Sequence, residues 1–413
     1  MSRILITGMG IVSATGSNVA ETLCSLRENR SGIDRVRHLK TAHTEFPVGE
    51  IKMSNREMIS RLQIPENKPA TRTSLIGILA VKEALTMARL ANVLLPGKSN
   101  VAFINGTTVG GMDKSELFYT DFLENDRHNR YIATHDCGAC TEIIADYFGA
   151  FSHVSAVSTA CSSAANAIML GAELLKSRRA DIVVAGGAEC LTKFHLNGFN
   201  ALMILDKEPC RPFDATRAGL NLGEGAAYLV METDEHYALR LRNSHPLPPY
   251  HSPLAELKGA ANACDAFHQT ATSPNGEGAV RAMTQALQNA KLLTSDIDYI
   301  NAHGTGTANN DLTEGIAIEH VFGNNIPPVS STKAFTGHTT SAAGGVEAVI
   351  AILSLINNFI PKNLNFKKKI DEISFEPYSN SNKTTIVNHN LKNVLSNSFG
   401  FGGNDTSLIF GKT

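Results

Sequence analysis

The feature that most constrains the fold is an order of elements that occurs twice along the chain. Residues 71–90 carry apolar side chains at helical spacing, and a short strand-like run, Val101 to Ile104, and a glycine-containing loop follow. The same helix, strand and glycine loop recur at residues 278–292, 297–300 and 301–307. A Ser-Ala-Ala segment then begins a helix rich in small residues in both copies, at 163–165 and 341–343. We therefore predict an internal duplication.

Short apolar strands separated by helical patterns predict an α/β fold, and two such halves predict a layered α/β/α/β/α body. We place the N-terminal half at residues 1–245 and the C-terminal half at 246–413. From Ile104 to Ser163 is 59 residues, but from Ile300 to Ser341 is 41, so the first half carries about 18 extra residues. We expect this insertion within 112–140, as a lid or a substrate wall.

Composition narrows the setting in which the chain works. The 37 Lys and Arg residues nearly balance 39 Asp and Glu, and a net charge of −2 gives no electrostatic case for binding nucleic acid. Seven scattered cysteines are too few for a disulfide scaffold, which favours a reducing cytoplasm. The glycine-broken N-terminus lacks a signal peptide, and the apolar run 346–360 is too short and too polar to span a bilayer. We expect no membrane insertion.

Cys161 is the first candidate for chemistry. It lies in Ser158-Thr-Ala-Cys-Ser-Ser-Ala-Ala165, between a strand-like run and the start of a helix. Unpaired amides at a helix start carry partial positive charge, which lowers a thiol pKa and favours the nucleophilic thiolate. The alternative is a small buried cysteine that fills a tight turn.

Two histidines and a lysine strengthen the interpretation of Cys161 as a nucleophile. His303 lies in a glycine–threonine loop after a strand, and His338 precedes the second small-residue helix. If the halves are duplicated, these loops share one face with the Cys161 loop, so the three side chains could meet where the halves join. Lys333 could orient a histidine or pair with a carboxylate, or be an ordinary surface lysine.

The segment Asn397-Ser-Phe-Gly-Phe-Gly-Gly-Asn404 alternates aromatic residues with glycines. Such a segment can bring backbone N–H groups and a movable ring, Phe399, against a ligand. It could equally be a tight turn before the closing strand.

These motifs resemble those of the β-ketoacyl-carrier-protein synthases, most closely the ketosynthase I/II branch of the thiolase-like superfamily. The resemblance extends from residues 6–13 through Arg211-Pro-Phe-Asp214 and Leu222-Gly-Glu-Gly225 to 397–403. It implies the duplicated, five-layered thiolase-like fold. It also implies an acyltransferase that needs no metal or redox cofactor.

The resemblance assigns roles by motif. Cys161 matches the cysteine that becomes acylated, and His303 and His338 match the two catalytic histidines. Lys333 and Glu347 match the supporting lysine and glutamate.

The same resemblance identifies a partner and its contacts. Thr305 and Thr307 match the pair that holds the phosphopantetheine arm of an acyl carrier protein, and Phe399 matches a gating phenylalanine. A homodimer, or a heterodimer with a ketosynthase homologue, is expected.

The implied reaction is a decarboxylative Claisen condensation that lengthens a fatty-acid or polyketide chain by two carbons. An acyl group passes to Cys161, with the backbone amides of Cys161 and Phe399 expected as oxyanion donors. A malonyl thioester then loses carbon dioxide, and His303 and His338 stabilise the enolate that attacks the acyl cysteine.

Departures from the housekeeping pattern predict an unusual acyl chain. Ser162-Ser163 follows the cysteine, and the insertion is aromatic, with Phe118, Tyr119, Phe122 and Tyr131. Residues 265–268 and 339–341 are similar to those of ketosynthases from aryl polyene and flexirubin-type pigment pathways, which extend a conjugated chain.

Three alternatives remain at this point. A nicotinamide-dependent dehydrogenase fits poorly, because Gly8 and Gly10 lack the third glycine of the dinucleotide-binding pattern. A zinc site at Cys137 and Cys140 lacks a nearby second pair of ligands. A non-catalytic partner subunit of the chain-length-factor type is the alternative of most weight, although such subunits typically lack the active cysteine that Cys161 provides.

Overall fold

A computed structural model of the chain describes residues 2–65, 67–90, 100–242, 252–379 and 390–413. Its strands form one sheet with the bounds β1 Ile4–Ser13, β2 Val101–Gly106, β3 His153–Val157, β4 Ile182–Glu189, β5 Gly225–Thr233, β6 Ala255–Cys264, β7 Tyr299–Asn301, β8 Val329–Ser330, β9 Asn393–Gly400 and β10 Asn404–Gly411. The helices are α1 Val19–Arg27, α2 Asn55–Leu62, α3 Arg72–Met87, α4 Met112–Glu124, α5 Cys137–Phe148, α6 Ser163–Lys176, α7 Lys193–Ala201, α8 Asp234–Arg242, α9 Glu277–Ala290, α10 Ala308–Phe322, α11 Lys333–Thr336 and α12 Ala343–Asn357, with 3-10 turns η1 Asn129–Thr134, η2 Thr294–Asp296 and η3 Thr340–Ala342.

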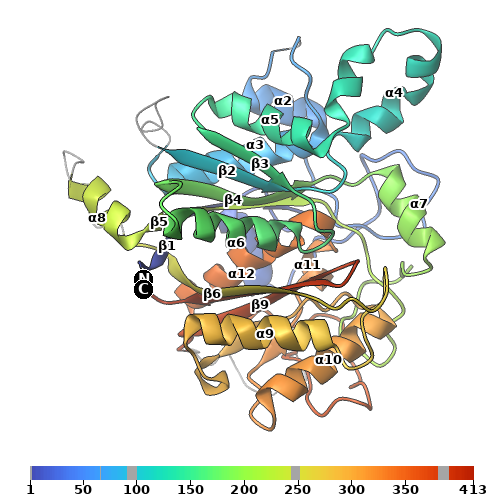
Figure 1. The fold of residues 1–413 in the computed structure, drawn as a ribbon. Helices are drawn as coiled ribbons and strands as arrows, with labels where there is room; N and C mark the ends of the chain where they lie inside the picture. Colours follow the sequence, from blue (N-terminus) through green and yellow to red (C-terminus); the bar gives the residue numbers. More distant parts are fainter. Residues whose placement is uncertain (1, 66, 91–99, 243–251, 380–389) are drawn as a thin grey trace.

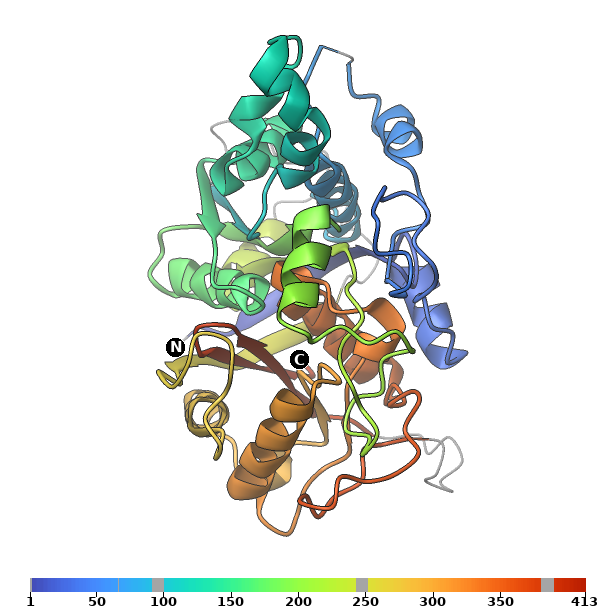
Figure 2. The same cartoon turned by 90° about the vertical axis from the view of Figure 1, so that its right-hand side faces the viewer.

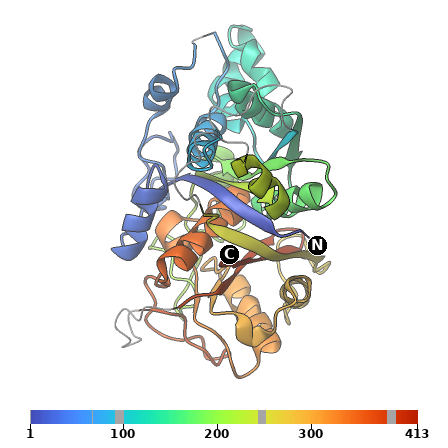
Figure 3. The ribbon, with the colours of Figure 1, turned by 90° about the vertical axis from the view of Figure 1, so that its left-hand side faces the viewer.

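The order of strands in the sheet shows the duplication. The order is β3-β2-β4-β5-β1 followed by β6-β10-β9-β7-β8, so the second half mirrors the first about the junction of β1 and β6. The equivalent pairings also agree in direction: β2 is parallel to β3 and β4, as β7 is to β8 and β9, and the inner pairings are antiparallel in both halves. Figure 3 shows β1 and β6 side by side across the middle of the molecule. The predicted repeat is therefore present in the fold.

The two halves of this sheet form two β layers. With helices outside and between them they give five layers, α/β/α/β/α, which confirms the predicted fold class. In Figure 1, α3 and α5 cover the outer face of the first half, and α9 and α10 cover that of the second. The helices α6 and α12 lie between the two halves and contact each other. Figure 2 shows the halves stacked, the first above the second. The expected boundary between residues 245 and 246 lies outside the described residues.

Small residues allow the central helices to pack closely. A Cβ at Gly344 of α12 would lie 2.7 Å from the Cβ of Ala165 in α6, and one at Gly345 would lie 2.8 Å from the carbonyl oxygen of Ala227. Both distances are shorter than ordinary van der Waals contacts, so a larger side chain would push the helices apart. The helical stretch 340–357 begins before the run 346–360 and, unlike that run, is long and apolar enough to cross a membrane. However, 89% of it is buried inside the structure, as a core helix is.

The insertion folds as an arm. Residues 112–140 form α4, η1 and the first turn of α5, and the arm stands out at the upper right of Figure 1. The helix α4 has no buried residue, and its phenylalanine Phe118 stacks on Tyr131 of η1 at a ring-centroid distance of 4.9 Å. The rings of Phe118 and Tyr131 therefore help to hold α4 against η1.

Candidate active site

Cys161 lies in a tight turn between β3 and α6. Ala160, just before it, has a φ of 51°, a left-handed conformation that is strained for a residue with a side chain. The Ser162 hydroxyl donates to the side-chain oxygen of Asn404 at 2.8 Å, and the Thr159 backbone N–H donates to the Ser163 hydroxyl at 2.9 Å. These hydrogen bonds hold the turn in place.

The environment of the thiol differs from the sequence-based expectation. Burial raises the pKa of Cys161 to about 12, although Lys333 and the backbone N–H of Phe401 act in the opposite direction. Cys161 lies two residues before the first residue of α6 and is 6% exposed, so the loss of hydration outweighs the effect of the helix start on its pKa. The prediction of a lowered thiol pKa is therefore wrong for the free protein. Nucleophilic attack needs a nearby group that accepts the thiol proton.

His338 contacts the thiol. Its Nε2 atom lies 3.1 Å from the sulfur of Cys161. Burial lowers the pKa of His338 well below its ordinary value, and Lys333 and His195 lower it further. The imidazole is therefore neutral and can accept a proton.

His303 stands beside His338, with ring centroids 5.3 Å apart in an edge-to-face arrangement. The Lys333 ammonium contacts Nδ1 of His303 at 3.2 Å and also donates to its backbone carbonyl. Because an ammonium group has no acceptor, Nδ1 accepts and Nε2 carries the hydrogen. Burial, then Lys333 and His338, lower the pKa of His303 well below its ordinary value. The ring is thus held as a neutral donor.

Two buried glutamates support this pair of histidines. Glu347 forms an ion pair with Lys333 inside the protein. Glu314 accepts hydrogen bonds from the backbone N–H groups of His303 and Gly304 at 2.8 and 2.7 Å. Glu347 was expected from the motif, whereas Glu314 lies in α10 without a local pattern that marks it.

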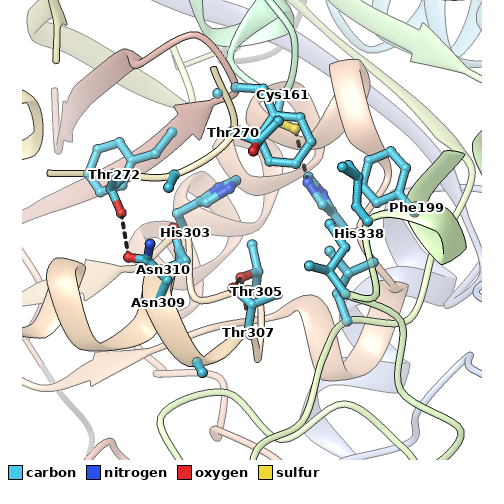
Figure 4. Close-up of a pocket in the computed structure, with 18 of the residues that line it drawn as sticks. Cys161, Phe199, Thr270, Thr272, His303, Thr305, Thr307, Asn309, Asn310 and His338 are labelled. Carbon is cyan, nitrogen blue, oxygen red and sulfur yellow. Dashed lines mark hydrogen bonds between the residues drawn. The ribbon is translucent and has the colours of Figure 1, made fainter. Parts of the chain in front are cut away.

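The three reactive side chains open into one cavity. Cys161, His303 and His338 line a cavity of about 380 Å³ together with Thr305 and Thr307. Figure 4 shows the two histidines pointing toward the cysteine, with both threonines below them. The threonine hydroxyls lie 2.9 Å apart. No residue of 112–140 lines this cavity in the described chain, so the arm does not form its wall.

The aromatic–glycine segment 397–404 places two phenylalanine rings, Phe399 and Phe401, near the active site. Phe399 lies in β9, 5% exposed, with its ring centroid 5.8 Å from that of His303. Phe401 lies beyond the end of β9, and its backbone N–H, rather than that of Phe399, donates toward the sulfur of Cys161. The Phe401 ring stacks on Phe199 of α7 at 5.8 Å. Phe399 is held within the β ladder with β10, and the expectation that its backbone N–H binds the oxyanion stays a prediction.

Comparison with known proteins identifies the family. The N-terminal domain model of β-ketoacyl synthases matches residues 1–236, and the C-terminal domain model matches residues 254–367. The chain belongs to the β-ketoacyl synthase family. It is similar to 3-oxoacyl-[acyl-carrier-protein] synthase 1 of Escherichia coli K12, with 32% identity over 100% of this chain and 99% of that protein. It is 30% identical to 3-oxoacyl-[acyl-carrier-protein] synthase 2 of Staphylococcus aureus COL, over 99% of this chain and 98% of that protein.

The solved structures that match this chain agree with this family assignment. The ishigamide ketosynthase/chain length factor matches with a TM-score of 0.89 at 28% identity, over 100% of this chain and 99% of that one. The ketosynthase ApeO in complex with its chain length factor ApeC, from Xenorhabdus doucetiae, matches with a TM-score of 0.83 at 29% identity, over 100% and 98%. The protein is thus a β-ketoacyl synthase, an acyltransferase that elongates an acyl chain by Claisen condensation.

Proposed function

We propose that Cys161 carries the growing acyl chain and that His303 and His338 activate the malonyl unit. The observation that carries this proposal is the 3.1 Å contact between His338 Nε2 and the Cys161 sulfur, with His303 beside it at one cavity. In the first half-reaction, His338 accepts the thiol proton and the sulfur attacks the acyl thioester. The donor C–S bond then breaks, and His338 passes the proton to the carrier thiolate that leaves. The N–H of Phe401 lies where it can bind the resulting oxyanion, together with that of Cys161.

In the second half-reaction, the carbonyl of the malonyl thioester binds against the two imidazoles. Decarboxylation leaves an enolate, and hydrogen bonds from the Nε2–H groups of neutral His303 and His338 stabilise it. His338 carries its hydrogen on Nε2 at this stage, because the acylated cysteine no longer donates to that atom. The enolate carbon attacks the acyl carbonyl on Cys161, and the C–S bond breaks to regenerate the cysteine. Lys333 fixes the tautomer of His303 that this step needs.

The substrate partner we propose is an acyl carrier protein. Thr305 and Thr307 stand in the lining of the cavity with their hydroxyls facing each other, and suit the amides of a phosphopantetheine arm. The Phe399 and Phe401 rings flank the reactive centre. Phe401, which is half-buried and stacks on Phe199, is better placed to move as a gate than the buried Phe399.

We propose that the chain works as a dimer in the cytoplasm. The strand β3 ends the sheet, pairs only with β2 in the described chain, and exposes His153, Val154 and Ala156. An unpaired strand edge can accept a strand from a second subunit. The arm adds exposed apolar side chains at Leu117, Tyr119, Leu123 and Ile132. The partner is a second copy of this chain or a chain-length-factor homologue, the kind of partner that the ketosynthase ApeO has in its complex with ApeC.

The substrate we propose is an unusual, conjugated acyl chain of the polyene type, on the motifs at 265–268 and 339–341. The structure places both beside the active site: Asp265 contacts the glycine segment, and Thr339 follows His338. Incubation with malonyl carrier protein and a panel of acyl primers, followed by intact-mass analysis, tests this. Repeated additions of two carbons to unsaturated primers support it, and extension of saturated primers alone contradicts it.

The second candidate function is a non-catalytic partner subunit. The same assay with Cys161→Ala distinguishes the two. Loss of product supports an active enzyme. Unchanged product in a complex with a second ketosynthase would show that this chain only assists its partner.

A further inference from the structure

Asp405 is a buried carboxyl group that the reaction scheme does not use. It is the second residue of β10 and is 1% exposed. In the part of the chain that the structure describes, neither of its carboxyl oxygens has a hydrogen-bond partner. A buried carboxylate normally binds several donors, since burial of an unpaired charge is costly. The position therefore suits a neutral carboxyl group.

The surroundings of Asp405 contain more negative than positive charge. A Cβ on Gly278 of α9 would lie 2.3 Å from Asp405 Oδ2 and 2.8 Å from the Cβ of Asp265, so both side chains crowd the same point. Asp265 accepts hydrogen bonds from the backbone N–H groups of Ser273 and Gly278, at 2.6 and 3.1 Å.

Three charged groups face Asp405: Asp265, Glu314 and Arg281. Burial raises the pKa of Asp405 to about 8, and Asp265 at the end of β6 and Glu314 of α10 add to this, whereas Arg281 of α9 opposes it. The β9 residue opposite Asp405 is Phe399, which has no charge. At neutral pH the group holds its proton.

Asp405 lies where two loops of the active site meet. The backbone N–H of Asp265 donates to the carbonyl of Gly403, and that of Gly402 donates to the carbonyl of Gln269, both at 2.7 Å. Residues 270–272 of one loop and 399–401 and 403 of the other line the cavity that holds Cys161. A charge on Asp405 would repel Asp265, which belongs to the other loop.

We propose that Asp405 is a positioning residue that works in its protonated form and keeps the 265–273 loop packed against the glycine segment 400–403. Loss of this proton at alkaline pH separates the two loops and slows the loading of Cys161. The proposal rests on the proposed function only in its second part, because the proton and the loop contact can be measured without any substrate.

The first test uses thermal stability and the neutral variant Asp405→Asn. Native wild-type protein keeps the proton to about pH 8, whereas an unfolded chain releases it near pH 4. Between these values the native state binds more protons, so wild-type stability falls as pH rises, and the Asn variant lacks this loss. We expect the melting temperature of Asp405→Asn minus that of wild type to increase from about pH 5 to about pH 8 and to level off above. A difference that is constant with pH overturns the proposal.

Two further variants make this test robust. The titration of Glu314 changes the melting temperatures of both wild type and Asp405→Asn, so its effect largely cancels in the difference between them. Asp405→Ala, which is also uncharged, must show the same rise with pH even if its melting temperature is lower throughout. Asp371→Asn, at a carboxylate whose side chain is 83% exposed, must follow wild type.

The second test measures acyl transfer from an acyl carrier protein to Cys161 by rapid quench. We expect the ratio of the Asp405→Asn rate to the wild-type rate to rise about fivefold between pH 8 and pH 9, as wild type loses its proton. Hydrogen exchange in residues 265–273 and 400–403 should increase over the same range in wild type alone. A flat rate ratio with a rising stability difference refutes the positioning role. Absence of transfer in wild type at every pH would instead refute the proposed function, and the stability test would stand.

Discussion

Replacement of Lys333 by Met separates the structural role of this lysine from its role in the reaction. The ammonium group is buried between Glu347 and His303, so its loss leaves the Glu347 carboxylate without a counter-charge. Breaking a buried ion pair in this way costs about 3–5 kcal/mol. With an unfolding entropy of about 2.1 cal/mol/K per residue, this corresponds to a fall in melting temperature of about 4–6 °C for 413 residues.

The same variant should lose decarboxylation for a different reason. Without Lys333, the Nδ1 atom of His303 loses the donor that fixes its tautomer, and the Nε2–H donor is no longer assured. Loss of one positioned donor to a developing oxyanion lowers a rate by about 100- to 1000-fold. Acyl loading should fall less, because the base proposed for that step is His338, which contacts Cys161.

The double variant Lys333→Met with Glu347→Gln decides between the two effects. Glutamine removes the stranded charge, so most of the melting temperature should return, while carbon dioxide release from malonyl carrier protein should stay low. Lys368→Met, at a lysine whose side chain is 67% exposed, serves as the control. Recovery of decarboxylation in the double variant would refute the reasoning, since it would mean that Lys333 acts on the reaction only through stability.

Three other predictions follow from the site. Cys161→Ser should abolish chain extension, and mapping after incubation with an acyl thioester should find the acyl group on Cys161 and on none of the other cysteines. His303→Ala should lower carbon dioxide release by orders of magnitude and spare part of acyl loading, whereas His338→Ala should impair both; single-turnover assays of each half-reaction would contradict this if the two variants behaved alike. Gly402, with a φ of 82°, should resist replacement by Ala, which slows loading measured by rapid quench; unchanged loading in that variant, together with unchanged coupling of decarboxylation to condensation in Phe399→Ala, would reduce the segment to a structural turn.

The sequence predicts the fold well because the repeat is local. A helix, a strand and a glycine loop each leave a short pattern, and two copies of that order allow few arrangements. The ends of the elements are less predictable: the helix expected from Ser341 begins at Ala343, after a 3-10 turn, and the strand expected at 297–300 is β7, Tyr299–Asn301. These boundaries depend on hydrogen bonds with other segments rather than on local preference.

The candidate site is only partly predictable. Cys161, His303 and His338 stand in marked turns, and the structure brings all three to one cavity. The thiol pKa was expected to fall because the sequence shows the helix start but not the burial around it. Glu314 and Asp405 have no such local mark, since a buried carboxyl group gains its role from neighbours far away in the chain.

The strand β6 lies between the first and the last strand of the chain. Its residue Leu257 pairs with Ile4 on one side and with Phe410 on the other, so the first and last strands end against the same short segment. The two ends of the chain accordingly lie close together in Figure 3. A circular permutant could join the two ends by a short linker and have its new termini between the halves. In this permutant the histidines would precede the cysteine along the chain, and every strand would keep its pairing partners. The strand pairings of the folded state therefore do not depend on which half comes first along the chain.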